Sequence, residues 1–272
     1  MKCKFASRCP LKQMEICFRY PEYMKKDKPY GCLFMHVLQM LELWEELKRR
    51  YLPTLVRISR NVTKSTLFSI PMVDDIVKVM IILHDYGKAS KNYVSPGEYN
   101  AQFYHEIVSG CLSYNVLKNC NERIASTIAS AILLHHEHRI YRKMFNIGGY
   151  SYARKSAIRY IVRKCSSKVF FDSMANEAFK TIIQSFTSTG NTTTDLSAFK
   201  EQYCESELAE SMREIRDNVW CLRYKSWFTV GAFNHILVLL DIRAACKTRE
   251  EKDKLSYYFD TVLHKGRLPL QG

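Results

Sequence analysis

Histidine and aspartate side chains form two doublets in this sequence, and each doublet ends an apolar segment. His84 and Asp85 follow residues 77–83, and His135 and His136 follow residues 128–134. Because both segments have helical apolar spacing, the doublets should point into a protein core. Imidazole and carboxylate groups are ligands of divalent metal ions, so the doublets indicate a metal centre that could perform hydrolysis.

Three more residues of the same types lie on the apolar stripes of other predicted helices. They are His36, His105 and Asp241. A single inward-facing histidine is more often a hydrogen-bonded core residue than a ligand. An unpaired buried carboxylate, however, costs on the order of several kcal/mol, and the doublets make a shared metal site the better explanation. The whole set suffices for two ions about 3.5–4 Å apart that keep open positions for water and substrate.

The elements that must position these residues are helices. Apolar residues recur at helical spacing through most of the chain, and strand-like alternation is scarce. The predicted helices span residues 33–50, 73–86, 103–118, 122–136, 152–168, 205–223, 228–247 and 253–264. Residues 89–101 and the hydroxyl-rich residues 185–194 are predicted loops.

We therefore predict an all-α helical bundle in one domain of residues 1–272, with the metal site in its core. An N-terminal extension of about 1–32 carries cysteines, the core spans about 33–250, and a C-terminal helix covers about 251–272. Cys3, Cys9, Cys17 and Cys32 lack the close pairs usual in zinc sites, so zinc binding and disulfide formation both stay open.

Composition excludes several classes of protein and favours an anionic partner. With 272 residues, 47% of them hydrophobic, the chain can fold around a core, which excludes disordered and collagen-like proteins. The net charge of +14 favours nucleic acid or another acidic surface. We expect a cytoplasmic protein with mostly reduced thiols and no membrane partner, since the N-terminus has no apolar signal region and the densest apolar stretches are short.

The order of the candidate ligands resembles a known family. His36, the doublet in His84-Asp85-Tyr86-Gly87-Lys88, and Asp241 reproduce the H…HD…D order of the HD-domain phosphohydrolases. The intervening His105, His135 and His136 are similar to the fuller pattern of the HD nuclease of type I CRISPR interference. The resemblance spans residues 34–245 and is greatest to the stand-alone HD nuclease subunit that works with a separate helicase.

This resemblance implies roles for single residues. One metal would be held by His36, His84, Asp85 and Asp241, and a second by His105, His135 and His136, with Asp85 bridging the two. Asp85 and Lys88 would be the catalytic residues, with the Lys88 ammonium at the scissile phosphate or the leaving oxygen. The imidazole-rich ligand set favours manganese, iron, cobalt, nickel or zinc over magnesium. The family's histidine pair is often followed by glycine, whereas Glu137 and His138 follow it here.

A basic segment follows the second doublet and is the candidate substrate surface. Residues 138–171 contain no aspartate or glutamate, and Lys155, Arg159 and Arg163 fall at i, i+4 and i+8 on one predicted helix face. A run of charge often only solvates a helix, but its position next to the ligands favours a nucleic-acid backbone, in single strands above all. The predicted contact residues are Arg139, Arg142, Lys143, Lys155, Arg159 and Arg163.

The leading interpretation is a metal-dependent HD nuclease that hydrolyses phosphodiester bonds of nucleic acid, with single-stranded DNA favoured, in CRISPR interference, an antiviral defence. The sequence has no Gly-x4-Gly-Lys-Ser/Thr loop, so strand separation is expected from a separate CRISPR helicase and an RNA-guided surveillance complex. Two alternatives remain open at this point. One is an HD phosphohydrolase acting on nucleotides or signalling nucleotides, and the other is a catalytically silent nucleic-acid-binding subunit.

Overall fold

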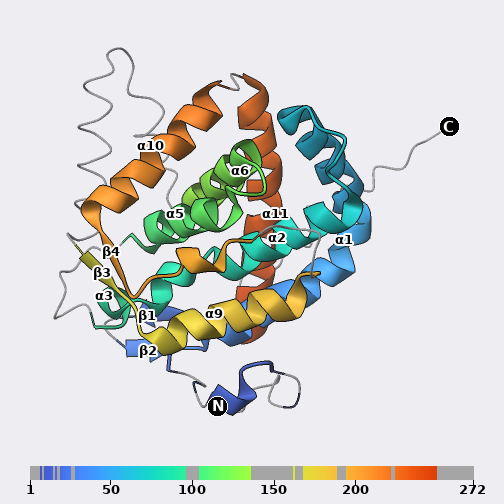
Figure 1. Ribbon diagram of the computed structural model, residues 1–272. Coiled ribbons are helices and arrows are strands. Elements are labelled where there is room, and N and C mark those ends of the chain that lie inside the picture. Colours follow the sequence, from blue (N-terminus) through green and yellow to red (C-terminus); the bar gives the residue numbers. More distant parts are fainter. Residues whose placement is uncertain are drawn as a thin grey trace.

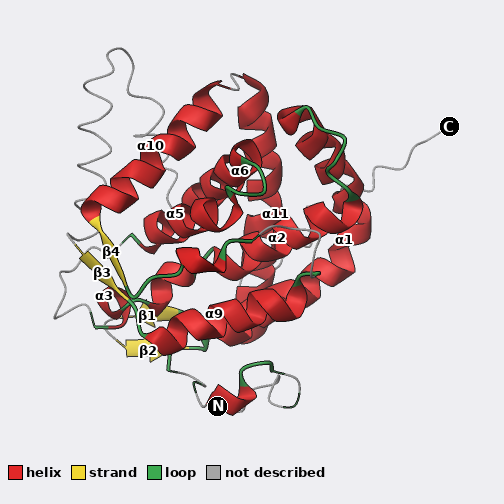
Figure 2. Cartoon of the chain, in the orientation of Figure 1, coloured by secondary structure: helices red, strands yellow, loops and turns green. Residues whose placement is uncertain are grey.

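The described part of the chain folds into a bundle of helices with short strands at one end (Figures 1 and 2). A computed structural model describes residues 7, 9–14, 16, 19–25, 28–95, 104–135, 162, 168–188, 194–221 and 224–249. The long helices are α1 (Leu33–Thr63), α2 (Ile70–Leu83), α5 (His105–Leu117), α6 (Glu122–Leu134), α9 (Ser173–Phe186), α10 (Glu205–Cys221) and α11 (Tyr224–Arg249). The all-α prediction is confirmed.

Short elements complete the described part of the chain. The helical turns are η1 (Lys12–Met14), η2 (Tyr86–Ala89), α3 (Lys91–Val94) and η3 (Leu196–Ala198). Strands β1 (Tyr23–Lys25) and β2 (Lys28–Tyr30) form an antiparallel hairpin, and β3 (Lys168–Phe170) pairs antiparallel with β4 (Gln202–Cys204).

Helix α2 is the buried helix on which the site depends. Ser69 caps its N-terminus by accepting a hydrogen bond from the backbone N–H of Met72, at 3.4 Å. From Val73 to Leu83 all residues except Lys78 are buried. Helices α1, α5 and α9 pack against α2. Its apolar surface therefore fixes the C-terminal end, where the first doublet follows, inside the bundle.

Three further helices enclose the same region. Helices α5 and α6 pack on each other, α11 lies against α1 and α6, and α10 covers α5 and α6. Figure 1 shows α5 and α6 near the centre of the bundle, with α10 along one side. This arrangement brings the ends of α2 and α6 and the middle of α11 to one place.

Helix α1 is longer than its prediction of 33–50. The helix continues to Thr63 through Pro53, although proline removes one helical hydrogen bond. Leu52, Leu55 and Val56 continue the buried stripe on the far side of the proline. Burial of this stripe outweighs the local cost of the proline.

The structure contains helix α9 at residues 173–186, where the sequence analysis predicted no helix, so the prediction is wrong for this segment. Its buried residues Ala175, Phe179 and Ile182 follow helical spacing, so the signal is present in the sequence. The helix ends at Phe186, so its last two residues lie in the segment 185–194 that was predicted to be a loop. The predicted helix 253–264 lies outside the described residues. Of the predicted helix 152–168, only Val162 and Lys168 are described, and Lys168 begins strand β3.

Helix α11 has the length and composition of a membrane span over Phe228–Cys246, where the mean hydropathy is 1.3. Core helices of globular proteins also meet this criterion. Here α11 packs against α1 and α6 and carries Asp241 to the buried histidines described below, so we describe it as a core helix.

We predict that Phe179→Ala lowers the free energy of unfolding by about 3–5 kcal/mol. The Phe179 ring lies 5.2 Å from the ring of Phe34 in α1 and 5.1 Å from that of Tyr86 in η2, between ring centres, so its removal leaves a cavity under the site. Urea denaturation measures the loss. Glu177→Ala, on the exposed face of the same helix, is the control. A loss below about 1 kcal/mol for Phe179→Ala would contradict this packing.

Candidate metal centre

Six of the seven predicted metal ligands lie within the described residues, and the fold brings all six together. His36 is in the first turn of α1, His84 and Asp85 follow α2, His105 begins α5, His135 follows α6, and Asp241 is in α11. His84 and Asp85 are fully buried, and the Asp241 side chain is 14% exposed. His136 lies outside the described residues.

The Asp85 carboxylate lies at the centre of this cluster. Its Oδ2 atom is 3.2 Å from Nε2 of His84 and 2.7 Å from Nζ of Lys88. Its Oδ1 atom is 3.1 Å from Nε2 of His105 and 3.5 Å from Nε2 of His135. Each carboxylate oxygen therefore faces a different subset of the nitrogens, as a bridging ligand would.

His36 and Asp241 form a second part of the cluster beside His84. Nε2 of His36 lies 3.0 Å from Oδ1 of Asp241, and the rings of His36 and His84 are 5.6 Å apart between centres. Two groups have ligand atoms that all lie within 4.8 Å of one another, namely His36–His84–Asp241 and His84–Asp85–His135. Because the two groups share His84, they are adjoining parts of one centre.

The orientation of His84 and His135 directs Nε2 of each ring toward the centre. Nδ1 of His84 is 2.7 Å from the carbonyl oxygen of Ile81, and Nδ1 of His135 contacts the carbonyl oxygen of Ile132. A carbonyl only accepts, so Nδ1 carries the proton and donates it. In a neutral imidazole the Nε2 atom then presents a lone pair, and here that lone pair faces an oxygen of Asp85. Two acceptors face each other in this way only when a proton or a metal ion lies between them.

Hydrogen bonding within the described residues leaves the same atoms unsatisfied. Nε2 of His84 and Oδ1 of Asp85 are buried and have no hydrogen-bond partner in that part of the chain. Buried polar atoms are seldom left in this state. Imidazole nitrogens and carboxylate oxygens are suitable ligands for divalent transition metals, so the residues present fit a metal centre.

The charge of the cluster also fits bound cations. Four carboxyl groups lie in or against it, on Asp85, Asp241, Glu22 and Glu106, and Lys88 supplies one positive charge. Carboxyl groups therefore outnumber the lysine among these residues. Buried carboxylates are stabilised by cationic partners, so this composition suits bound cations.

Charge pairing also sets the pKa values in the cluster. Burial acts against ionisation of Asp85, but His84 and Lys88 outweigh it and hold its pKa well below the usual value. Burial likewise acts against charge on His36, but the hydrogen bond to Asp241 and the nearby carboxylates raise the pKa of His36 overall. The cluster therefore favours ionised carboxylates and attracts positive charge.

Two carboxyl residues of the centre were missed by sequence reasoning. Glu106 is buried with Oε2 3.6 Å from Nδ1 of His105, and its position next to that histidine was an available signal. Glu22 is buried with Oε1 3.6 Å from Nδ1 of His36. No sequence signal pointed to Glu22. It lies in the N-terminal segment of about 1–32, which was predicted to be an extension outside the core.

The residues after Asp85 shape the site in different ways. Lys88 is buried, and burial lowers its pKa, but Asp85 leads the negative groups that raise it overall. Tyr86 packs in the core against Phe171, with ring centres 4.3 Å apart, and its hydroxyl donates to Asn176. Gly87 has no positive φ angle. Its role is close contact, because a Cβ atom there would lie 2.7 Å from Cα of His105.

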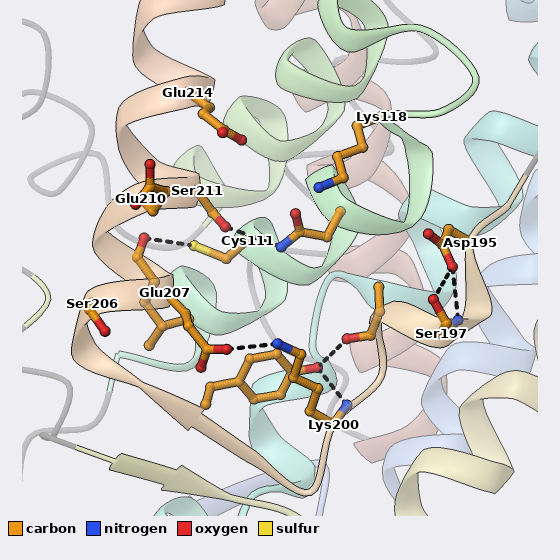
Figure 3. A pocket seen from close by; sticks show the side chains of 14 residues that line it. Cys111, Lys118, Asp195, Ser197, Lys200, Ser206, Glu207, Glu210, Ser211 and Glu214 are labelled. Carbon is orange, nitrogen blue, oxygen red and sulfur yellow. Dashed lines mark hydrogen bonds and ion pairs between the residues drawn. The ribbon is translucent and has the colours of Figure 1, made fainter.

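A separate cavity of about 440 Å³ lies between α5 and α10 and contains none of the predicted ligands (Figure 3). Figure 3 shows that Glu207 on its wall pairs with Lys200, at 2.7 Å, and that Asp195 binds Ser197. These polar groups hold neighbouring elements together. The cavity is therefore distinct from the histidine cluster.

The predicted substrate surface is not tested by the structure. The contact residues Arg139, Arg142, Lys143, Lys155, Arg159 and Arg163 lie outside the described residues. The same holds for His138. His235 is exposed on α11, in agreement with its exclusion from the site.

We predict that Gly87→Ala lowers the free energy of unfolding by about 1–3 kcal/mol and weakens metal binding. The added methyl group would meet the backbone of His105, which cannot move aside without carrying its imidazole away from Asp85. Thermal unfolding and metal titration measure the two effects. Gly231→Ala is the control, since nothing lies within 4 Å of its Cβ position. Unchanged stability and metal affinity in Gly87→Ala would contradict this role.

Comparison with known proteins agrees with the geometry. The HD domain family matches residues 33–196. The chain is 37% identical over 107 residues to the CRISPR-associated endonuclease Cas3-HD of Pyrococcus furiosus and 36% identical over 121 residues to that of Methanocaldococcus jannaschii. These matches cover 38% and 42% of this chain and 44% and 49% of the relatives, so the chain spans about half of their length.

A solved structure shows the same likeness. The CRISPR-associated Cas3 HD domain protein of Methanocaldococcus jannaschii aligns with a TM-score of 0.53 and 26% identity, over 76% of this chain and 95% of that protein. The family match covers more than half of the chain and includes five of the six described ligands. This chain is therefore a member of the HD domain family.

Proposed function

We propose that this protein is a metal-dependent nuclease that hydrolyses phosphodiester bonds of single-stranded DNA in CRISPR interference. The observation that carries the proposal is the arrangement of three imidazoles around the buried carboxylate of Asp85, a set of groups that fits a divalent metal ion. The relatives and the structural neighbour, named as CRISPR-associated HD endonucleases or HD domain proteins, support it.

The ligand atoms of the chain divide between two adjoining positions. His36, His84 and Asp241 would hold one ion, and Asp85, His105 and His135 a second, with Asp85 close enough to His84 to serve both. His136 is proposed as a further ligand of the second position. The histidine-rich set favours manganese, iron, cobalt, nickel or zinc over magnesium.

Bound ions of this kind activate water and polarise a phosphodiester. The chain itself fixes the geometry. Ile81 and Ile132 hold the Nε2 lone pairs of His84 and His135 toward the centre through their carbonyl oxygens. Lys88 holds a positive charge against Asp85, where its ammonium group can stabilise developing negative charge on a phosphate.

A nucleic acid is favoured over a free nucleotide as the substrate by the charge of the chain. The net charge of +14 and the basic segment of residues 138–171 suit an extended phosphate backbone. Contacts with phosphates carry little sequence information, so accessibility would govern cleavage and single strands would be preferred. Within the proposal, a separate CRISPR helicase and an RNA-guided surveillance complex supply the single strand, in the cytoplasm.

We predict that Asp85→Asn and His135→Ala each lower cleavage of single-stranded DNA by more than about 100-fold, because changes even outside the direct ligands of a metal cost about 10–100-fold. The assay is digestion of end-labelled and circular single-stranded DNA after addition of manganese. Circular dichroism confirms that the variants remain folded. His235→Ala, an exposed histidine on α11, is the control and should cleave normally.

The same assay separates the alternatives. Faster hydrolysis of nucleotides than of oligonucleotides by the unaltered protein would favour a nucleotide phosphohydrolase. Failure to bind metal, with no activity after manganese is added, would favour a catalytically silent subunit. Full activity of folded Asp85→Asn would contradict the proposed metal chemistry.

We predict that replacing Lys155 and Arg159 with glutamine weakens binding of single-stranded DNA and lowers its salt dependence. On single strands, the slope of log affinity against log salt concentration falls by about 0.7 for each lost phosphate contact. Fluorescence anisotropy at several salt concentrations measures the slope. Arg57→Gln, an exposed position on α1, is the control. An unchanged slope in the double variant would remove these residues from the substrate surface.

A further inference from the structure

We propose that Glu22 is a positioning residue of the metal centre, which orients the imidazole of His36 so that its Nε2 lone pair faces the bound ion. This inference rests on the proposed metal-dependent function. Glu22 lies outside the matched HD domain, which begins at residue 33.

The His36 imidazole lies between two carboxyl groups. Nε2 faces Oδ1 of Asp241 at 3.0 Å, and Nδ1 faces Oε1 of Glu22 at 3.6 Å. The second distance is longer than a hydrogen bond, so Glu22 acts through its charge. When Nε2 binds an ion, the ring proton is left on Nδ1, and the negative charge of Glu22 on that side stabilises this tautomer.

The position of His36 in its helix explains why an outside group is needed. His84 and His135 follow the last turns of their helices, where carbonyl oxygens of the helix end lie next to Nδ1, those of Ile81 and Ile132. His36 is in the first turn of α1, where carbonyls point along the helix to later N–H groups. On the Nδ1 side of His36 lies instead a carboxylate from another segment of the chain, that of Glu22.

The N-terminal hairpin holds Glu22 in this place. Strands β1 and β2 pair Tyr23 with Tyr30, so Glu22 and Gly31 are the next residues on either side. Gly31 has a φ angle of +70°, and a Cβ atom there would lie 2.7 Å from Oε2 of Glu22. Glycine thus provides both the backbone conformation and the space for the carboxylate.

Two contacts tie the same segment to the core. The backbone N–H of Leu33 donates to the carbonyl oxygen of Tyr20, at 3.0 Å, and the hydroxyl of Tyr20 donates to Asp172 just before α9. Glu22 itself is buried. These contacts hold the segment that carries Glu22 against the core, so the Glu22 carboxylate has a fixed position beside His36.

The test is a metal titration of the full chain by calorimetry, with manganese added to protein that was freed of metal. We expect Glu22→Gln, which keeps the shape and removes the charge, to weaken manganese binding by about 10–100-fold. Glu46→Gln, on the exposed side of α1, is the control and should bind as the unaltered protein does. Glutamine is preferred to alanine at this position because it is isosteric with glutamate, so the variant tests the charge even if Glu22→Ala fails to fold.

A double-mutant cycle separates positioning from a general structural role. In a His36→Ala background, Glu22→Gln should cause no further loss of manganese affinity, because Glu22 acts through His36. Equal loss in both backgrounds, or unaltered affinity of Glu22→Gln, would overturn the inference while leaving the proposed function intact. Failure of the unaltered protein to bind any manganese would overturn both.

Discussion

The structure depends on one buried carboxylate, that of Asp85, surrounded by nitrogen atoms. Three imidazole Nε2 atoms and the Lys88 ammonium lie within 3.5 Å of its two oxygens. Lys88 is the one permanent cation in this group. Imidazole nitrogens gathered around a buried carboxylate form a set of groups that suits a bound cation at the centre. The helix packing described above serves to bring this group together from distant parts of the chain.

Helix ends determine how each imidazole is oriented. The two histidines that follow a helix have Nδ1 at a backbone carbonyl oxygen of that helix's last turn, at Ile81 and Ile132. The two histidines that begin a helix, His36 and His105, have a glutamate on the Nδ1 side instead. All four Nε2 atoms consequently face the carboxylates of the centre. The group on the Nδ1 side is thus a backbone carbonyl for a histidine after a helix and a glutamate for a histidine near a helix start.

Much of the centre could be predicted from the sequence, because its main ligands lie on apolar helix faces with a clear period. His84 and His135 are examples, since each directly follows a helix whose buried residues are apolar. Glu22 could not be predicted in this way. Its approach to His36 depends on hairpin register and on the space at Gly31, which are tertiary features. The reason for Gly87 was also beyond the sequence, since it is the close approach of His105 from another helix.

The fold shows the same division between local and tertiary information. The amphipathic helices were largely predictable, although α9 was missed in spite of its spacing. The extent of α1 was not, because proline normally ends a helix and the packing of Leu52 and Leu55 outweighs this local rule. Strands β3 and β4 pair residues far apart in the chain, and three-residue strands carry too little alternation to be recognised.

The most direct test of the central claim is a crystal structure of the protein with zinc, with data collected at the zinc absorption edge. We predict an anomalous peak about 2.0–2.1 Å from Nε2 of His84, which marks a zinc ion that also binds the Asp85 carboxylate. A second peak on the His105 side of Asp85 would complete the pair. A crystal that binds zinc elsewhere but has no anomalous peak at Asp85, with His84 hydrogen-bonded directly to the carboxylate, would contradict a metal centre at this position.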